Sequence, residues 1–120
     1  MSEMLGDDFD ANYEQFLHEA AATGCVWGLE SDEGFALCPS TINENRDVLP
    51  LWSQPEFAEQ HREGEWQEYR VVPIALEELL DDWLPGMHED LTLVGPNWNP
   101  ALEGDEVEPL DLLEDFEESF

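Results

Sequence analysis

The sequence predicts a single α+β domain in which helices pack against a mainly antiparallel sheet of about five strands. Apolar residues recur at helical spacing in some segments and form short strand-like runs in others, and the two kinds alternate along the chain. At 120 residues the chain can close one hydrophobic core but not two. With 42% apolar residues and five Trp it should fold, unlike a disordered acidic chain. We expect residues 1–8 to be a flexible acidic N-terminus and residues 9–120 to form the domain.

The first half of the chain predicts a helix, a hairpin and a strand. Apolar residues recur at helical spacing after a capping candidate at Asp10, and Gly24 supplies a stop. Residues 25–38 contain two apolar runs around a turn, which favours a β-hairpin. Residues 48–52 form a short strand. Pro50 should place this strand at a sheet edge or on a bulge, because proline has no N–H to donate.

The middle of the chain predicts two helices on either side of a strand. Ser53 can cap a short helix that ends at Gly64, and residues 69–74 are typical of a strand. Leucines and a tryptophan line one side of a helix over residues 75–84. Pro85 and the glycine after it should end this helix, because proline lacks the N–H that a helix interior requires.

The last part of the chain predicts a strand over residues 91–95, a loop over residues 96–100 and a terminal helix with an acidic tail. Pro109 suits the first turn of that helix. Its inward side is expected to consist of Leu110, Leu113 and Phe116. The residues that should form the centre of the core, each the apolar member of its local pattern, are Trp27, Trp52, Leu79, Trp83 and Leu113.

Several segments together resemble a known family. They are Cys-Val-Trp-Gly-Leu at residues 25–29, the Leu-Pro-Leu-Trp-Ser stretch within residues 48–58, residues 74–85 and residues 93–98. In this order they resemble the bacterial domain-of-unknown-function family 2750, over roughly residues 12 to 115. The resemblance implies a compact bacterial α+β protein. Because that family has no assigned activity, it supplies no catalytic residue.

The composition also predicts a cellular location. No apolar run approaches the roughly 18 residues that a membrane helix needs. The first residues lack the basic and apolar regions of a signal peptide, so we expect a cytoplasmic protein. Cys25 and Cys38 are expected to be reduced, buried thiols, because the hairpin register places Cys38 nearer Trp27 than Cys25.

The charge is the most unusual property of the chain. It has 31 acidic residues, three arginines and no lysine, so the formal net charge is −28 at pH 7. Self-repulsion of this size opposes folding, and it also repels nucleic acids and anionic membranes. We therefore expect neither a nucleic acid nor a membrane as a direct partner, and we expect a basic protein instead.

The sequence contains no motif that indicates catalysis or metal binding. Its histidines include no pair at the spacing of a zinc helix, and there is neither a Cys-x-x-Cys nor a glycine-rich phosphate loop. Residues 7–10 and 103–106 are acidic but lack the ligand pattern of an EF-hand loop. Carboxylates are so numerous that a pair of them does not indicate acid–base catalysis. We expect no catalytic residue, no cofactor and no metal site.

The acids gather on two segments of the second half. Four lie on the helix over residues 75–84, opposite the leucines, where neighbours four positions apart are about 5–6 Å apart. Others lie in the tail, partly at the carboxyl end of the last helix, where the helix dipole disfavours anions. The candidate partner-binding residues are Glu77, Glu78, Asp81, Asp82, Asp105, Glu106, Glu108, Asp111, Glu114, Asp115, Glu117 and Glu118.

This pattern leads to the hypothesis of a non-enzymatic acidic binding protein. Rows of carboxylates on a folded surface can imitate a phosphate backbone and occupy the basic groove of a DNA- or RNA-binding protein. Two alternatives stay open. The acidity can be an adaptation of a housekeeping domain to a saline cytoplasm, or the fold can contain an enzyme or cofactor site that has no sequence motif. One continuous ridge of acids would favour mimicry, and an even coat would favour salt adaptation.

Overall fold

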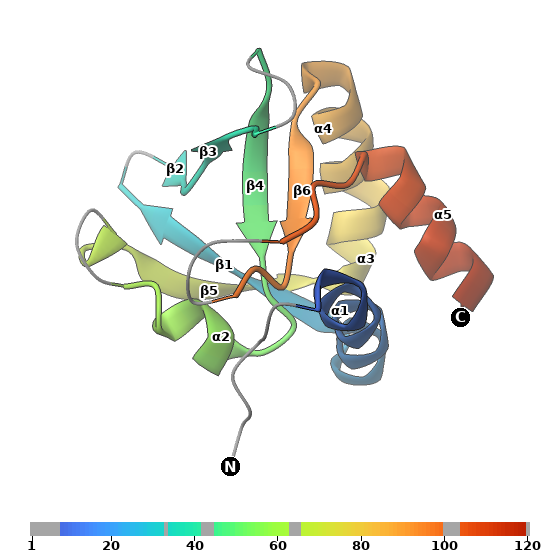
Figure 1. Ribbon diagram of the computed structural model, residues 1–120, viewed down its shortest axis with the longest axis horizontal. Coiled ribbons are helices and arrows are strands. Elements are labelled where there is room, and N and C mark those ends of the chain that lie inside the picture. The colour runs from blue at the N-terminus through green and yellow to red at the C-terminus, as the bar shows by residue number, and fades with distance from the viewer. Residues whose placement is uncertain (1–7, 33, 42–44, 63–65, 100–103, 120) are drawn as a thin grey trace.

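Two small β-sheets meet at a pair of tryptophans, and most of the helices gather on one side of them (Figure 1). The computed structural model describes residues 8–32, 34–41, 45–62, 66–99 and 104–119. Its α+β class agrees with the sequence prediction. The order of its helices and strands also agrees, except that the second run of the predicted hairpin is divided into two short strands, Gly34–Phe35 and Cys38–Pro39, which belong to different sheets.

The first sheet is antiparallel throughout. Its strand order is β2 (Gly34–Phe35), β1 (Cys25–Ser31) and β5 (Arg70–Ala75). β1 and β2 form the expected hairpin, although β2 is only two residues long. β1 and β5 pair along six residues, which confirms the strand predicted at residues 69–74 with a shift of one residue.

The second sheet contains a parallel pair of strands. Its order is β3 (Cys38–Pro39), β4 (Asp47–Leu51) and β6 (Leu93–Pro96), with β3 antiparallel and β6 parallel to β4. The prediction of one mainly antiparallel sheet of five strands is therefore wrong in its arrangement. β6 returns beside β4 in the same direction because a long connection, which includes a helix, separates the two strands.

Pro50 marks the point where β4 changes its neighbour. It lies inside the central strand of its sheet, so the predicted edge position is wrong. Leu51 turns its backbone carbonyl toward the β6 side, where it accepts an N–H at 2.8 Å, and the adjacent Pro50 therefore faces the opposite side. There β4 has left β3, and Trp52 exchanges two backbone hydrogen bonds with Trp27 of β1, at 2.7 and 2.8 Å. The missing N–H of proline is tolerated between these two pairings.

Helix α1 (Phe9–Thr23) has a cap at each end. The Asp8 carboxylate accepts the N–H of Ala11 at 3.1 Å, so Asp8 is the N-cap and not Asp10, which lies in the first turn. An acid in that turn is still favoured by the helix dipole. Gly24 ends the helix in the left-handed conformation, at φ 79°, as predicted.

The second half of the chain contains one long helix in place of the predicted helix over residues 75–84. It consists of α3 (Leu76–Glu78), a π-helical turn η2 (Leu79–Trp83) and α4 (Leu84–Asp90). The prediction that Pro85 ends the helix is wrong. The N–H of Leu84 bonds to the carbonyl of Leu79, five residues back, and this wider turn comes directly before the proline. Pro85 then lies in the first turn of α4, where its missing N–H costs little.

The strand predicted over residues 91–95 begins two residues later. Leu91 ends α4 in the left-handed conformation, at φ 62°, and its side chain is 59% exposed. β6 can start only after this reversal of the chain.

Helix α2 (Pro55–Glu59) is short, and Ser53 does not cap it. Gln54 is the residue before its first turn and makes no side-chain capping bond. The Ser53 side chain is buried and hydrogen-bonds to other elements. The predicted end of this helix, Gly64, lies outside the described residues.

Helix α5 (Pro109–Ser119) begins at the predicted proline but is rotated relative to the prediction. Leu112 and Phe116 are buried, whereas Leu110 is 41% exposed and Leu113 is half-buried. The inward stripe therefore follows the i, i+4 spacing of 112 and 116, not the spacing of 110, 113 and 116.

The largest core cluster lies between the helices and the sheets. Its centre contains Leu79, as predicted, and a second cluster contains fully buried Trp52. Trp27, Trp83 and Leu113 are half-buried at the margins of these clusters, so their predicted central positions are wrong. Cys25 and Cys38 are free thiols, as expected, but they are half-buried rather than buried. No helix among the described residues is both long and apolar enough to span a membrane.

Candidate functional site

The acids predicted on the helix over residues 75–84 form one exposed face of α3 and η2. The inner side of this helix is Leu79, which has no exposed surface, flanked by half-buried leucines and Trp83. The helix starts after Ala75 without a side-chain cap, and acids in its first turn are favoured by the helix dipole. We call the four exposed carboxylates the acidic helix face; its members are Glu77, Glu78, Asp81 and Asp82.

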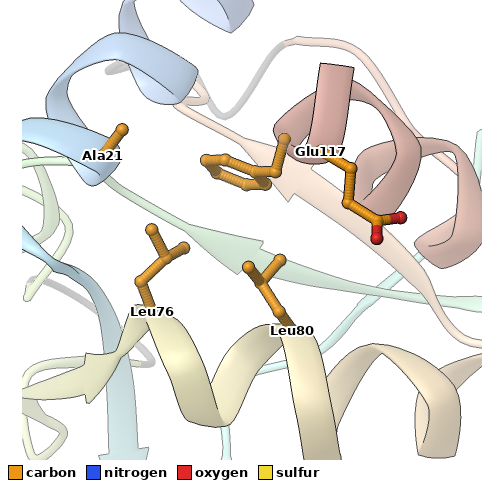
Figure 2. A pocket seen from close by; sticks show the side chains of 5 residues that line it. Ala21, Leu76, Leu80 and Glu117 are labelled. Atoms are coloured by element: carbon orange, nitrogen blue, oxygen red, sulfur yellow. The ribbon is translucent and has the colours of Figure 1, made fainter. Parts of the chain in front are cut away.

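A pocket of about 380 Å³ lies next to this face, between α1, α3, η2 and α5 (Figure 2). Each of these four elements contributes one apolar side chain to its lining. Glu117 of α5 stands at its edge, so the pocket joins an apolar lining to a carboxylate. Its lining consists of Ala21, Leu76, Leu80, Phe116 and Glu117. The sequence prediction did not include this pocket, because its residues come from segments far apart in the chain.

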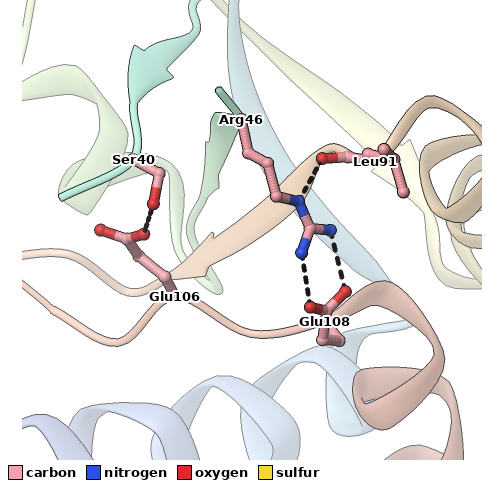
Figure 3. A network of polar contacts seen from close by, with 5 residues as sticks. All are labelled: Ser40, Arg46, Leu91, Glu106 and Glu108. Carbon is pink, nitrogen blue, oxygen red and sulfur yellow. Dashed lines mark hydrogen bonds and ion pairs between the residues drawn. The ribbon is translucent and has the colours of Figure 1, made fainter. Parts of the chain in front are cut away.

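Two of the tail acids predicted to bind a partner make intramolecular hydrogen bonds that hold the C-terminal segment against the rest of the chain (Figure 3). Glu106 accepts hydrogen bonds from the Ser40 hydroxyl and from the N–H and hydroxyl of Thr41, the last two at 3.0 and 2.6 Å. Glu108 accepts two bonds from the Arg46 guanidinium, at 2.6 and 2.9 Å. Arg46 also donates from Nε to the Leu91 carbonyl at 2.6 Å. The bidentate contact lowers the pKa of Glu108 below its usual value.

Asp115 and Asp105 also have intramolecular roles. The Tyr13 hydroxyl of α1 donates to the Asp115 carboxylate of α5, and burial together with this carboxylate raises the pKa of Tyr13. The backbone carbonyl of Asp105 accepts the Trp98 indole N–H at 2.8 Å. Burial, and then the nearby negative charge of Asp10, raise the pKa of Asp105. The remaining tail candidates are exposed; they are Asp111, Glu114, Glu117 and Glu118.

The three arginines are all paired with acids away from the acidic helix face. Arg46 contacts Glu108, and Arg62 contacts Glu59 of α2. Arg70 of β5 lies 3.2 Å from Glu30 and 3.7 Å from an acid in the hairpin turn. Because the chain has no lysine, no Lys or Arg neutralises the acidic helix face within the described residues.

A buried polar network that sequence reasoning missed ties α1 to the ends of β4 and β6. Ser53 donates to the Glu19 carboxylate at 2.6 Å, and the Ser53 N–H donates to the Asn97 side-chain oxygen at 2.9 Å. The Asn97 amide also donates to the Asn12 carbonyl at 3.2 Å. Ser53 is 1% exposed, so this serine packs inside the fold. Asn97 has φ 47°, a left-handed conformation that Asn tolerates better than most residues. The Gly-Pro-Asn segment at residues 95–97 is the sequence signal that could have indicated a turn with this conformation.

The described residues contain no group of three His, Cys, Asp or Glu side chains that could hold a metal ion. Of the two acidic segments considered for calcium, Asp7 and Glu103 lie outside the described residues.

The fold and the acidic helix face together define a small α+β protein with an uncompensated acidic surface beside an apolar pocket. The chain belongs to the family described as "Protein of unknown function (DUF2750)", which matches residues 13–116 and so covers most of it. The resemblance predicted from the sequence segments is therefore confirmed. No curated protein and no solved structure is significantly similar to this chain.

Proposed function

We propose that this protein is a non-enzymatic acidic binding protein whose partner is a basic protein, with a DNA- or RNA-binding protein as the class that fits best. The contact surface is the acidic helix face together with the exposed acids of α5. Carboxylates held on a rigid helix resemble the spaced charges of a phosphate backbone, and such a surface steers a basic groove toward itself.

This proposal rests on one observation: no Lys or Arg among the described residues pairs with the carboxylates of the acidic helix face. Every arginine is already paired with an acid elsewhere among the described residues. Like charges at i, i+4 positions, such as Glu77 with Asp81 and Glu78 with Asp82, destabilise a helix by a few tenths of a kcal/mol per pair. A cationic partner would supply the missing compensation.

The even distribution of the other acids favours salt adaptation as a second candidate. Exposed acids occur on all of the helices from α1 to α5. A coat of this kind would keep a protein hydrated in a saline cytoplasm without any specific partner. The two candidates differ in one respect: only mimicry requires that the position of the acids matters.

The test compares two variants that remove the same amount of charge. The first converts the acidic helix face to amides, and the second converts four exposed acids on other elements. Each variant is assayed for displacing duplex DNA from basic DNA-binding proteins captured at low salt. The face variant carries Glu77→Gln, Glu78→Gln, Asp81→Asn and Asp82→Asn. The control variant carries Glu14→Gln, Asp47→Asn, Glu56→Gln and Glu68→Gln.

We expect the face variant to lose competition with DNA and the control variant to keep it. Binding by the unmodified protein should weaken steeply with salt, because many charge pairs form across the interface. If both variants lost competition with DNA equally, the binding would depend on overall charge and not on the position of the acids, and this result would favour salt adaptation. Failure of the unmodified protein to bind any basic protein at low salt would refute the proposal.

A further inference from the structure

The pocket beside the acidic helix face leaves apolar surface exposed on a molecule that is otherwise strongly acidic. Leu76 and Leu80, one turn apart on the long helix, point into the pocket (Figure 2), and Phe116 of α5 also lines it. Phe116 is itself 3% exposed, so it forms the base, while the two leucines are half-buried and remain partly open to solvent. A volume of about 380 Å³ lies within the range of small-ligand sites, roughly 300–1,000 Å³, and is large enough to accept an apolar side chain of a partner.

The charges around the pocket select the chemistry of its occupant. Glu117 lines the pocket, and the exposed acids Glu77 and Asp81 directly follow the two lining leucines in the sequence. An anionic amphiphile would be repelled by these carboxylates. A second copy of this chain, with the same net charge of −28, would be repelled for the same reason. A neutral apolar ligand would leave the acids uncompensated and partly desolvated.

We propose that this pocket anchors an apolar side chain of a basic partner segment, while Lys or Arg residues on either side of that anchor pair with Glu117, Glu77 and Asp81. This inference rests on the proposed function and adds the binding mode to it. The anchor residue removes Leu76 and Leu80 from water. The cations on either side of it neutralise the three carboxylates. An amphipathic helix that places apolar anchor residues in a hydrophobic groove is a common mode of peptide recognition.

The test uses two synthetic lysine-rich peptides of equal length and charge. One carries a single central leucine, and the other carries serine at that position. Their affinities are measured by fluorescence anisotropy at one fixed ionic strength. We expect the leucine peptide to bind about tenfold more tightly, which is the order of gain expected from burying one leucine side chain.

Three variants assign this gain to the pocket. Leu80→Gln replaces an apolar lining residue with a polar one and should abolish the difference between the peptides. Ala21→Leu, which occupies part of the pocket without changing charge, should reduce that difference. Glu117→Gln should weaken both peptides about equally. Glu56→Gln is the matched control, because Glu56 is an exposed acid on α2, away from α3 and α5 (Figure 1), and should change neither affinity beyond about twofold. Methyl NMR shifts of Ala21, Leu76 and Leu80 report occupation of the pocket directly and do not depend on any variant folding.

The outcomes separate this inference from the proposed function. Equal, salt-sensitive affinities for the two peptides, without methyl shifts at the pocket, would overturn the anchor while leaving the acidic binding surface in place. A third peptide, which keeps the leucine but carries serine in place of every lysine, tests the charge selection, and an affinity equal to that of the lysine-rich leucine peptide would overturn it. Absence of binding by either peptide at low salt would overturn both proposals.

Discussion

At the scale of single residues, the Arg46 side chain joins three separate parts of the chain. Its guanidinium contacts Glu108 before α5 and the Leu91 carbonyl after α4, and Arg46 itself precedes β4 (Figure 3). Its side chain is only 15% exposed, whereas that of Glu108 is 47% exposed. A bidentate contact with one shielded partner contributes more than an ordinary surface ion pair, although solvent around Glu108 limits the gain.

We expect Arg46→Gln to lower the free energy of unfolding by about 1–2 kcal/mol at neutral pH, measured by urea denaturation. The matched control is Arg70→Gln, because the Arg70 side chain is 58% exposed and should contribute only a few tenths of a kcal/mol. Equal losses in the two variants would contradict the special role of Arg46.

The effect of Arg46→Gln should also depend on pH. The contact lowers the pKa of Glu108 in the folded state, so its stabilisation is complete above the usual Glu pKa and is lost as the pH falls through the lowered value. The difference between the unmodified protein and Arg46→Gln should therefore shrink in strong acid. A difference that stays constant down to the lowest pH would show that the Glu108 contact does not cause it.

At the scale of elements, local patterns predicted the fold well where sequence neighbours decide the structure. Gly24 and Pro109 mark the end of α1 and the start of α5 because glycine and proline restrict the backbone at their own positions. The acids of the acidic helix face were placed outward correctly, since leucines three and four residues apart mark the inner side. The π-helical turn before Pro85 was not predicted, because propensity alone treats such a proline as a helix end.

Contacts between distant segments could not be predicted from the sequence. Glu106 and Ser40 are 66 positions apart, Glu108 and Arg46 are 62 apart, and Tyr13 and Asp115 are 102 apart. No local pattern distinguishes these tail acids from the exposed ones, so all were assigned to partner binding. The pairing of β4 with β6 could not be predicted for the same reason, because it depends on how the long connection between the two strands folds back.

The rotation of α5 can be tested by truncating two adjacent leucines. Leu112 is fully buried, so Leu112→Ala should lower the free energy of unfolding by about 2–5 kcal/mol. Leu113 is half-buried, and Leu113→Ala should cost about 1 kcal/mol, because less apolar surface is lost. Urea denaturation of both variants measures the difference. Equal costs, or a larger cost at position 113, would support the inward stripe predicted from the sequence instead.

At the scale of the whole molecule, the charge and the compact shape oppose each other. The radius of gyration is 13.1 Å, close to the value of about 13.6 Å expected for a compact domain of this length. Within that small volume the chain holds a formal net charge of −28. The described ion pairs of the three arginines offset only a small part of it. Repulsion between carboxylates must therefore reduce the stability of the folded state under conditions of low salt and neutral pH.

Moderate acid should relieve part of this repulsion. The folded-state pKa of Asp105 is raised by burial and by Asp10, so folding favours its protonated form. A group of this kind adds stability below its unfolded pKa, and that stability is lost as the pH rises through the folded value. We expect the melting temperature to increase from neutral pH toward about pH 5, before the Glu108 contact is lost in stronger acid. Asp105→Asn, which keeps the neutral form at every pH, should be more stable than the unmodified protein at neutral pH, and a lower melting temperature would contradict this account.

Salt should raise the melting temperature throughout the range in which it shortens the screening length. That length falls from about 10 Å at 0.1 M to about 3 Å at 1 M, which is below the Cβ spacing of about 5–6 Å expected between acids four positions apart, such as Glu77 of α3 and Asp81 of η2. Thermal unfolding in sodium chloride should therefore shift upward by several degrees between these concentrations. Tetramethylammonium chloride at equal ionic strength is the control, because its large cation screens charge but fits poorly among carboxylates. Equal shifts in the two salts would indicate screening alone, whereas a larger shift with sodium would indicate bound cations. A melting temperature that did not change in either salt would show that the carboxylates are compensated locally, and the account of a self-repelling acidic surface would then be wrong.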